Sequence, residues 1–197
     1  MISAIVLAAG EGTRFGGTKQ VERLRGKPLV QHAVDAAAEA GAGEIVVVVG
    51  HDAERVRDAL ELPPGARIAV NDRYADGQST SLAAGLVALD ASSEAAIVLL
   101  ADQPGIEARH VRSLIETFDD LGRRAEILRI RFRDGPGPAL LARGVWEEAT
   151  TLAGDVGARV LFDADQARVH WVPFDEEAPP DVDRVADLER ALRSSRA

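Results

Sequence analysis

The sequence predicts an α/β fold, with a mostly parallel β-sheet that carries helices on both faces. Two observations predict it: the residue types of the short apolar runs, and the way these runs alternate with longer segments. Short apolar runs rich in β-branched residues, which are typical of buried parallel strands, alternate along the chain with longer segments of helical period. Such alternation produces parallel strands joined by right-handed crossovers, which leaves little topological freedom. Ligands of these sheets bind beyond the carboxyl ends of the strands.

The strand-like segments are short and apolar, and the helix-like segments lie between them. In order, we expect strands at 2–7, 44–49, 67–70, 95–100, 126–132 and 168–174. We expect helices at 28–40, 53–60, 79–89, 107–121, 144–152, 155–162 and 185–193. Pro28 can open the first helix because an N–H in the first turn needs no partner, and Gly41 ends it. The prolines and glycines at 135–138 predict a loop.

The composition is that of an ordinary globular protein, with 46% apolar and 28% charged residues. A chain of 197 residues can form one domain, and we expect a single domain over 1–197. The net charge of −9 argues against a nucleic acid or an anionic membrane as partner. The absence of cysteine excludes disulfides and thiolate zinc sites. With no signal-peptide pattern and no apolar run near ~20 residues, we expect a cytoplasmic protein.

A glycine-rich loop follows the first strand. From Leu7 to Lys19 it reads L-A-A-G-E-G-T-R-F-G-G-T-K. Glycines bring backbone N–H groups close to a ligand, and successive N–H groups form a concave anion site. Arg14 and Lys19 add two positive charges. The loop therefore predicts a polyphosphate cradle, with an ordinary strand-to-helix turn as the alternative.

Better-known phosphate loops do not match. A Rossmann fingerprint needs glycine where Phe15 stands, and a P-loop needs lysine where Thr18 stands. Composition adds weight to Lys19, because it and Lys27 are the only lysines among 23 basic residues. Lysine is a compact, flexible point charge suited to a phosphate.

Asp102 closes the apolar run 97–101, so it lies at the carboxyl end of a buried strand. A carboxylate there suits Mg²⁺, which prefers one or two carboxylates together with phosphate oxygens and water. The alternative is that Asp102 caps the helix that starts near Glu107 or makes an Asx turn before Pro104. Because the glycine loop is in the same chain, we favour the magnesium ligand.

The polar segment 71–82 leaves one strand and enters a helix, which makes Asn71, Ser79 and Ser81 candidate nucleotide contacts. Helix capping by Ser79 or Thr80 is the alternative. The segment Gly77-Gln78-Ser79-Thr80-Ser81 lacks the final glycine of a nucleophile elbow, so we reject a hydrolase.

Two further segments carry candidate residues. Asp181 and Asp183 are two apart on an extended stretch and so point the same way, which makes one of them a candidate second metal ligand. A solvated acidic tail is the alternative. Asp155 lies at a turn into a helix, and Arg159 is compatible with an acceptor phosphate or with a surface charge.

Taken in order, six motifs resemble those of the molybdenum cofactor cytidylyltransferase (MocA-like) group of MobA-like nucleotidyltransferases. They are L-A-A-G-E-G-T-R-F-G-G-T-K, G-K-P-L, N-D-R-Y-A-D-G-Q-S-T-S-L, L-L-A-D-Q-P, G-D-V-G-A-R and D-V-D-R-V-A-D-L. The resemblance implies a Rossmann-like three-layer α/β/α sandwich of the nucleotide-diphospho-sugar transferase type. It also implies magnesium-dependent transfer of CMP from CTP to a phosphorylated acceptor, molybdopterin or the molybdenum cofactor, with release of pyrophosphate.

The resemblance assigns roles to particular residues. The nucleotide contacts are Leu7, Ala8, Ala9, Gly10, Glu11, Gly12, Thr13, Arg14, Lys19, Asn71, Ser79, Ser81 and Asp102. The catalytic residues are Arg14, Lys19 and Asp102. The metal ligands are Asp102 and Asp183, and the acceptor contacts are Gly154, Asp155, Arg159 and Asp181.

Two departures from the family pattern concern the acceptor more than the nucleotide. The family histidine of G-H-P is absent from Pro136-Gly137-Pro138, and Arg184-Val185 replaces the Thr-Pro of the tail motif. One alternative is transfer to another phosphorylated acceptor, an isoprenoid phosphate or a sugar phosphate; Lys19-Gln20 suggests the isoprenoid phosphate. The other alternative is a non-catalytic nucleotide-binding module.

Overall fold

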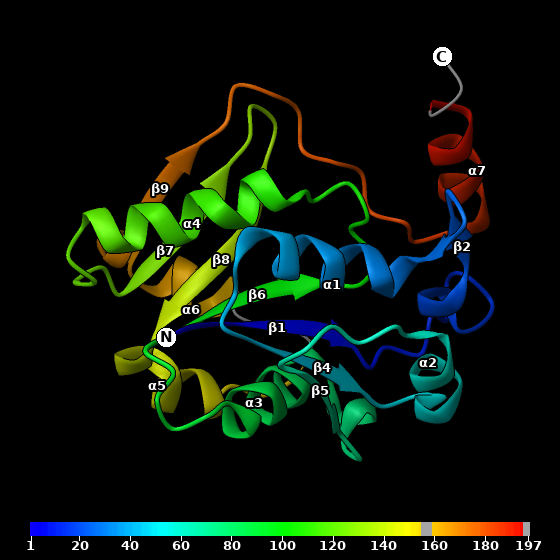
Figure 1. Cartoon of the computed structure of the whole chain (residues 1–197), viewed down its shortest axis with the longest axis horizontal. Helices are drawn as coiled ribbons and strands as arrows, with labels where there is room; N and C mark the ends of the chain where they lie inside the picture. Colours follow the sequence, from blue (N-terminus) through cyan, green and yellow to red (C-terminus); the bar gives the residue numbers. More distant parts are fainter. Residues whose placement is uncertain (155–158, 195–197) are drawn as a thin grey trace.

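The structure is a computed structural model that describes residues 1–154 and 159–194. Within these residues, seven strands form one sheet in the order β5-β4-β1-β6-β8-β7-β9 (Figure 1). They are β1 (Ile2–Ala8), β4 (Glu44–Val49), β5 (Ala66–Val70), β6 (Ala95–Leu100), β7 (Ile127–Arg131), β8 (Pro136–Ala142) and β9 (Val169–Pro173). Only β8 runs antiparallel to its neighbours within this described sheet, which confirms the mostly parallel sheet.

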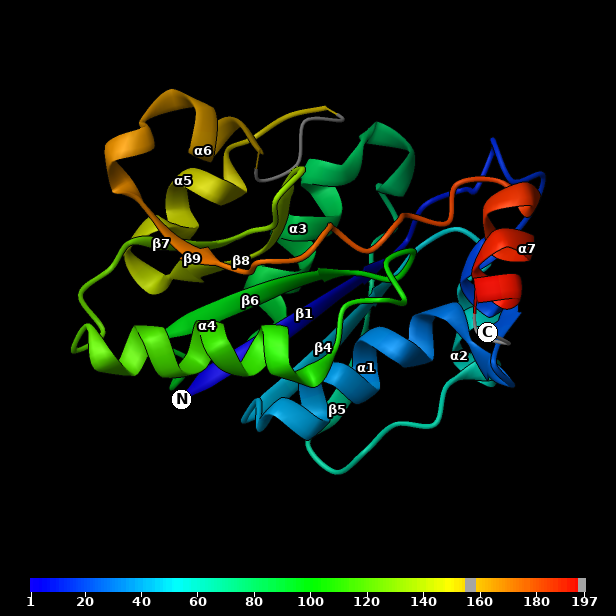
Figure 2. The same ribbon diagram turned by 90° about the horizontal axis from the view of Figure 1, so that it is seen from above.

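Helices cover both faces of the sheet, as predicted. They are α1 (Leu29–Ala40), α2 (Ala53–Ala59), α3 (Gln78–Ala88), α4 (Ala108–Asp120), α5 (Trp146–Thr150), α6 (Arg159–Ala164) and α7 (Val185–Ser194). α1 and α4 lie on one face, and α3, α5 and α6 lie on the other (Figure 2). This arrangement confirms the three-layer α/β/α sandwich. None of the described helices is long and apolar enough to cross a membrane.

The sheet divides the main core into two layers, which explains why its central strands read as unbroken apolar runs. In β4, Val47 and Val49 belong to the α1-side core, whereas Val46 and Val48 belong to the α3-side core. Both faces of the strand are therefore buried, so there is no polar face for the sequence to reveal.

The prediction of a loop at 135–138 was wrong, because residues from Pro136 onward form β8. β6 pairs only with residues 139–142 of this strand, so the prolines need no N–H on that side. A register shift between Arg129 and Arg131 of β7 accommodates the start of β8. Gly137 is required by packing, since an added Cβ would lie 2.6 Å from Phe132 Cε2.

Three further points concern short segments of the chain. The segment predicted as one helix over 144–152 is a 3₁₀ turn, Arg143–Val145, followed by α5. The start of the helix predicted over 155–162 lies outside the described residues, and α6 begins at Arg159. A two-residue hairpin of β2 (Arg23–Leu24) and β3 (Lys27–Pro28) precedes α1, and α7 packs against it through a small apolar cluster that includes Leu24 and Leu188.

Gly85 marks the closest approach of α3 to the sheet. A Cβ added there would lie 2.6 Å from Ile5 Cγ2 and 3.1 Å from Val48 Cγ2, both on stiff β-branched side chains of the core. We expect Gly85→Ala to lower the free energy of unfolding by about 1 kcal/mol or more, because overpacking outweighs the helix propensity that alanine gains. Urea denaturation measures this.

The matched control is Gly144→Ala, since nothing lies within 4 Å of the Cβ that this substitution adds. It should leave the stability unchanged or raise it slightly. Equal effects at the two positions would contradict the packing argument.

Candidate nucleotide-binding site

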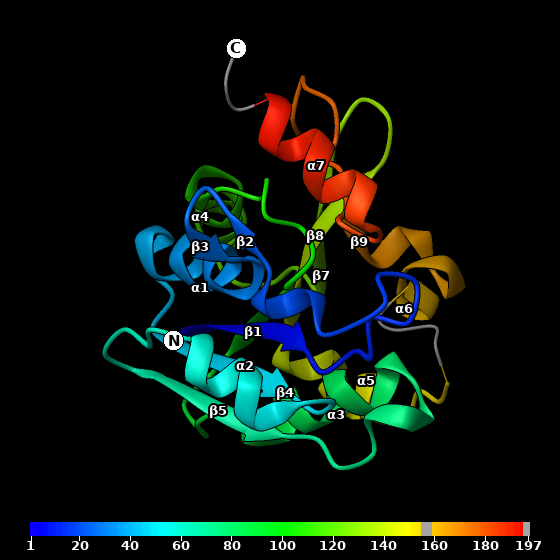
Figure 3. The ribbon, with the colours of Figure 1, turned by 90° about the vertical axis from the view of Figure 1, so that its right-hand side faces the viewer.

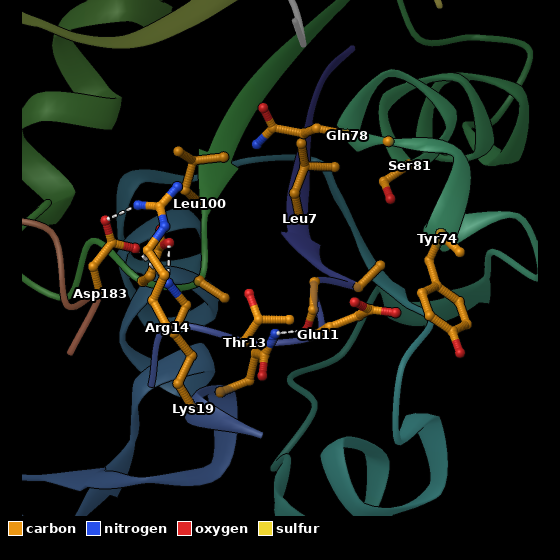
Figure 4. A pocket seen from close by; sticks show the side chains of 18 of the residues that line it. Leu7, Glu11, Thr13, Arg14, Lys19, Tyr74, Gln78, Ser81, Leu100 and Asp183 are labelled. Atoms are coloured by element: carbon orange, nitrogen blue, oxygen red, sulfur yellow. Dashed lines mark hydrogen bonds and ion pairs between the residues drawn. The ribbon is translucent and has the colours of Figure 1, made fainter. Parts of the chain in front are cut away.

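A cavity of 610 Å³ opens at the carboxyl ends of β1 and β6, the edge where ligands of parallel sheets bind. The glycine loop forms one wall, and the segment from Tyr74 into α3 forms the opposite wall (Figure 4). Leu7 and Leu100, the last side chains of the two strands on this face, lie between the walls. Sheet topology therefore brings the two sequence-predicted segments to one cavity.

The glycine loop is a tight turn that only glycine permits at position 12. Gly12 has a φ of +63°, and an added Cβ would lie 2.1 Å from the carbonyl oxygen of Gly17. The amides of Phe15 and Gly16 donate to the Gly12 carbonyl oxygen at 2.9 and 3.0 Å. This turn places the backbone of residues 9–14 along the cavity.

Lys19 joins the loop to two carboxylates. Its Nζ donates to Asp102 Oδ2 at 2.7 Å and to Asp183 Oδ1 at 3.1 Å. Burial alone lowers the pKa of Lys19, but the two carboxylates outweigh burial and raise it. Arg14, which is exposed, donates to Asp183 Oδ2 at 2.8 Å (Figure 4). Two cations from the loop thus meet two carboxylates, one from the turn after β6 and one from the segment before α7.

Asp181 lies beside this cluster but does not line the cavity. Its carboxylate accepts a hydrogen bond from Gln103 Nε2 at 2.8 Å. Burial, together with the charges of Asp102 and Asp183, raises the pKa of Asp181 against the opposing effect of Gln103 and Lys19. By contrast, the hydrogen bond from Lys19 lowers the pKa of Asp183. Val182, between the two aspartates, is buried, and its amide donates to the Asp102 carbonyl oxygen at 2.8 Å.

Asn71 organises the opposite wall without reaching the cavity. It is buried, and its Nδ2 donates to Thr80 Oγ1 at 2.9 Å and to Ser81 Oγ at 3.0 Å. Its Oδ1 accepts from the Arg73 amide at 3.0 Å. Asn71 therefore fixes the turn that carries Tyr74 and the start of α3, where Ser81 lines the cavity.

Two buried polar atoms beside the cavity have no hydrogen-bond partner among the described residues: Ser79 Oγ and Gln20 Oε1. Buried polar atoms normally have partners. The side-chain nitrogen of Gln20, Nε2, donates to the Gly10 carbonyl oxygen at 2.7 Å and so links Gln20 to the glycine loop. Both atoms are candidates to gain a partner when a ligand or ordered water is bound.

Most of the predicted site residues meet in this cavity. Those that line it are Leu7, Ala9, Gly10, Glu11, Gly12, Thr13, Arg14, Lys19, Ser81, Asp102 and Asp183. Those described that do not line it are Ala8, Asn71, Ser79, Gly154 and Asp181. Asp155 and the side chain of Arg159 lie outside the described residues. Gly154 touches the α3 wall through its carbonyl oxygen, which accepts from the Ser79 amide at 3.2 Å.

Sequence reasoning missed several lining residues. They are Gln20, Tyr74, Ala75, Asp76, Gly77, Gln78, Leu100 and Ala101. The segment 71–82 was identified as informative, but nothing in it singled out Tyr74. That residue packs against Gly50, where a Cβ would lie 2.7 Å from the Tyr74 Cβ. This contact comes from a distant strand end and leaves no local sequence signal.

Asp102 and Asp183 supply carboxylate oxygens, a ligand type that Mg²⁺ prefers. In the structure both carboxylates contact one cation, Lys19 Nζ. In the part of the chain that the structure describes, no three His, Cys, Asp or Glu side chains form a metal-binding group. A pair of carboxylates completed by phosphate oxygens and water is the set that Mg²⁺ prefers over an all-protein cage.

Comparison with known proteins agrees with this geometry. The model of the MobA-like NTP transferase domain matches residues 4–169. Nicotine blue oxidoreductase of Paenarthrobacter nicotinovorans is 32% identical, over 97% of this chain and 96% of its own length. Bifunctional protein GlmU of Geobacter sulfurreducens is 34% identical over 73% of this chain. The aligned part covers only 30% of the length of that relative.

Among solved structures, Rv0371c of Mycobacterium tuberculosis H37Rv is 30% identical, with a TM-score of 0.85 over 98% of this chain and 97% of that one. The same protein has been solved in complex with manganese, where the TM-score is 0.83 and the identity 29%. The similarity in fold therefore extends over nearly the whole of both chains.

Proposed function

Because this chain belongs to the MobA-like NTP transferase family, we propose that it transfers CMP from CTP to a phosphorylated acceptor of the molybdopterin type and releases pyrophosphate. The family assignment supports nucleotidyl transfer. The nucleobase, the acceptor and the choice of magnesium are the further content of the proposal.

The observation that carries the proposal is the meeting of Arg14 and Lys19 with Asp102 and Asp183 at the rim of the 610 Å³ cavity. In the proposed reaction, an oxygen of the acceptor phosphate attacks the α-phosphorus of CTP. The bond from that phosphorus to the oxygen bridging to the β-phosphate breaks, and pyrophosphate leaves with the electron pair. Arg14 and Lys19 position the phosphates and neutralise their charge, which is the main task of a protein in such transfers.

Asp102 and Asp183 would hold the divalent cation. A bound Mg²⁺ supplies charge neutralisation of the triphosphate and of the departing pyrophosphate. The manganese complex of Rv0371c is consistent with a divalent cation in this family. The acceptor contacts that we propose at Gly154, Asp155, Arg159 and Asp181 rest on the motif resemblance, together with the position of Asp181 beside Asp102.

A screen for pyrophosphate release tests the proposal. The purified protein is incubated with Mg²⁺, with each of the four nucleoside triphosphates in turn, and with molybdopterin-type, isoprenoid-phosphate and sugar-phosphate acceptors. We expect release that requires CTP and the molybdopterin-type acceptor. Release with another acceptor would reassign the substrate within the same reaction class.

A protein that binds nucleotides but releases no pyrophosphate with any pair would be a binding module instead. Because one relative is named as an oxidoreductase, the same samples should also be followed for redox change in a chromophoric substrate. Redox turnover without pyrophosphate would contradict the proposed reaction.

Ala9 is the proposed determinant of base preference. It is buried, lines the cavity and packs against Gly50, where a Cβ would lie 2.9 Å from the Ala9 methyl group. The family resemblance links alanine here to CTP and glycine to GTP, and a methyl group leaves less room for a purine. We expect CTP to bind more tightly than GTP. Ala9→Gly should narrow the gap without reversing it, since one methyl group discriminates by only ~1–3 kcal/mol, which is about 10- to 200-fold.

Calorimetric titration of both nucleotides with Mg²⁺ measures the gap. Ala8→Gly is the matched control, because it removes the same group from a neighbouring buried residue that does not line the cavity. A wild-type protein that prefers GTP would overturn the cytidylyl assignment.

A further inference from the structure

The outer half of the sheet carries a ladder of aromatic rings and guanidinium groups. The Arg129 guanidinium lies 4.2 Å from the centre of the Phe162 ring and 5.9 Å from that of Trp171. The Arg131 guanidinium lies 4.1 Å from the Trp171 ring centre. We call these four residues the stacking ladder. Arg131 is its exposed end.

The stacking ladder lies on the same face of the sheet as the nucleotide cavity. Trp171 packs against the α3-side core, and so do Leu7 and Val98 of the strands beneath the cavity. The strand register aligns Val98 with Ala139, and then with Arg129 and Trp171. The cavity and the ladder therefore lie on the same face of the sheet, and no ladder residue lines the cavity.

The exposed end of the ladder is also at the cavity edge. β7 runs parallel to β6, because each pairs antiparallel with β8 between them. Arg131 is the last residue of β7, just as Leu100 is the last residue of β6 before Asp102. Two strand spacings separate β7 from β6, which is about 10 Å. Figure 3 looks onto the end of the molecule where α7 lies and shows β7 and β9 beside β8.

Ion pairing distinguishes Arg131 from an arginine at the other end of the same strands. Arg168, just before β9, bonds Glu126 at 2.6 Å and Glu148 at 2.9 Å. Arg131 is exposed and has no ion pair within residues 1–154 and 159–194. Its stacked face contacts Trp171, which leaves the in-plane N–H groups to bind an anion.

We propose that the stacking ladder is a second binding site, which receives a planar, anionic ring system of the acceptor at Arg131 while the acceptor phosphate reacts in the cavity. The planar ring extends the stack beyond Arg131, and its anionic group takes the free N–H groups. This inference rests on the proposed function, and it restricts the acceptor to molecules that carry such a ring in addition to the reacting phosphate.

The test uses two probes that separate the ladder from the cavity. CMP with Mg²⁺ occupies the nucleotide site and cannot react. 6-Carboxypterin, a planar anion, is then titrated by calorimetry and by quenching of tryptophan fluorescence, with glycerol 3-phosphate as a non-planar anion. We expect 6-carboxypterin to bind the wild type with quenching. Arg131→Gln should weaken 6-carboxypterin binding at least tenfold. Arg131→Lys should retain only part of the wild-type affinity for 6-carboxypterin.

CMP affinity should be unchanged in both variants, because Arg131 does not line the cavity. Arg112→Gln is the matched control, since it removes another exposed arginine on α4, which covers the opposite face. The proposal is overturned if 6-carboxypterin fails to bind the wild type, binds the Arg131→Gln variant equally well, or binds no better than glycerol 3-phosphate. Failure of CMP to bind would instead contradict the proposed function.

Discussion

Asp102→Asn is expected to abolish pyrophosphate release, with a fall in rate of at least about 10²-fold, while the circular dichroism spectrum stays native. The substitution keeps the shape of the side chain and removes its charge. It leaves the backbone carbonyl of Asp102, which accepts from the Val182 amide, in place. The lost charge weakens both the proposed metal site and the ion pair that orients Lys19.

A metal titration separates these two effects. If Asp102 is a metal ligand, the residual activity of the variant should require far more Mg²⁺ than that of the wild type. Asp120→Asn is the matched control, because Asp120 is exposed at the end of α4 and does not line the cavity. Full activity of Asp102→Asn at limiting Mg²⁺ would rule out the assigned role.

Asp183→Asn should have a smaller effect than Asp102→Asn. Its side chain is 41% exposed, against 26% for Asp102, and it pairs with Arg14 as well as Lys19. Exposed charges interact through water and contribute less. Comparing the loss of activity in the two variants therefore reports how much Asp102 and Asp183 each contribute to binding the proposed cation.

The parts of the fold that could be predicted are those specified by local sequence. The glycine loop was identifiable because the reason for glycine at position 12 lies within the loop itself. A side chain at Gly12 would clash with the backbone of Gly17. β8 was missed because its prolines and glycine normally punctuate loops. They are tolerated in this strand because its pairing with β6 stops at Ala139, opposite Val98. That limit is set by the contact with the partner strand.

The same distinction applies to the site. The spacing of Asp181 and Asp183 predicted that they share one side of the chain, and the burial of Val182 between them agrees with it. It did not predict that Gln103 would bind one carboxylate while Lys19 binds the other. Those partners come from chain segments more than 75 residues away, at separations of 78 and 164 positions, and are set by the folded topology.

Lys19→Ala is expected to weaken CTP binding at least tenfold, which corresponds to about 1.4 kcal/mol. A hydrogen bond to a charged group is worth ~1.5–3 kcal/mol, and Lys19 is placed to give one to a phosphate. Its Nζ is also the shared partner of Asp102 and Asp183. Without it, Arg14 is the one side-chain cation of the loop that still pairs with these carboxylates in the described residues, so the triphosphate loses one of two positive charges.

The sequence supplies an unusually close control, because Lys27 is its one other lysine. Lys27 pairs with Asp35 and does not line the cavity. Lys27→Ala should therefore leave CTP affinity unchanged, while Lys19→Arg, which keeps the charge but not the compact ammonium group, should retain part of it. Calorimetry with Mg²⁺ present measures all three variants. Equal affinities for Lys19→Ala and Lys27→Ala would mean that the loop holds the triphosphate through its backbone N–H groups and Arg14 alone, and that Lys19 serves only to keep the two carboxylates together in the free protein.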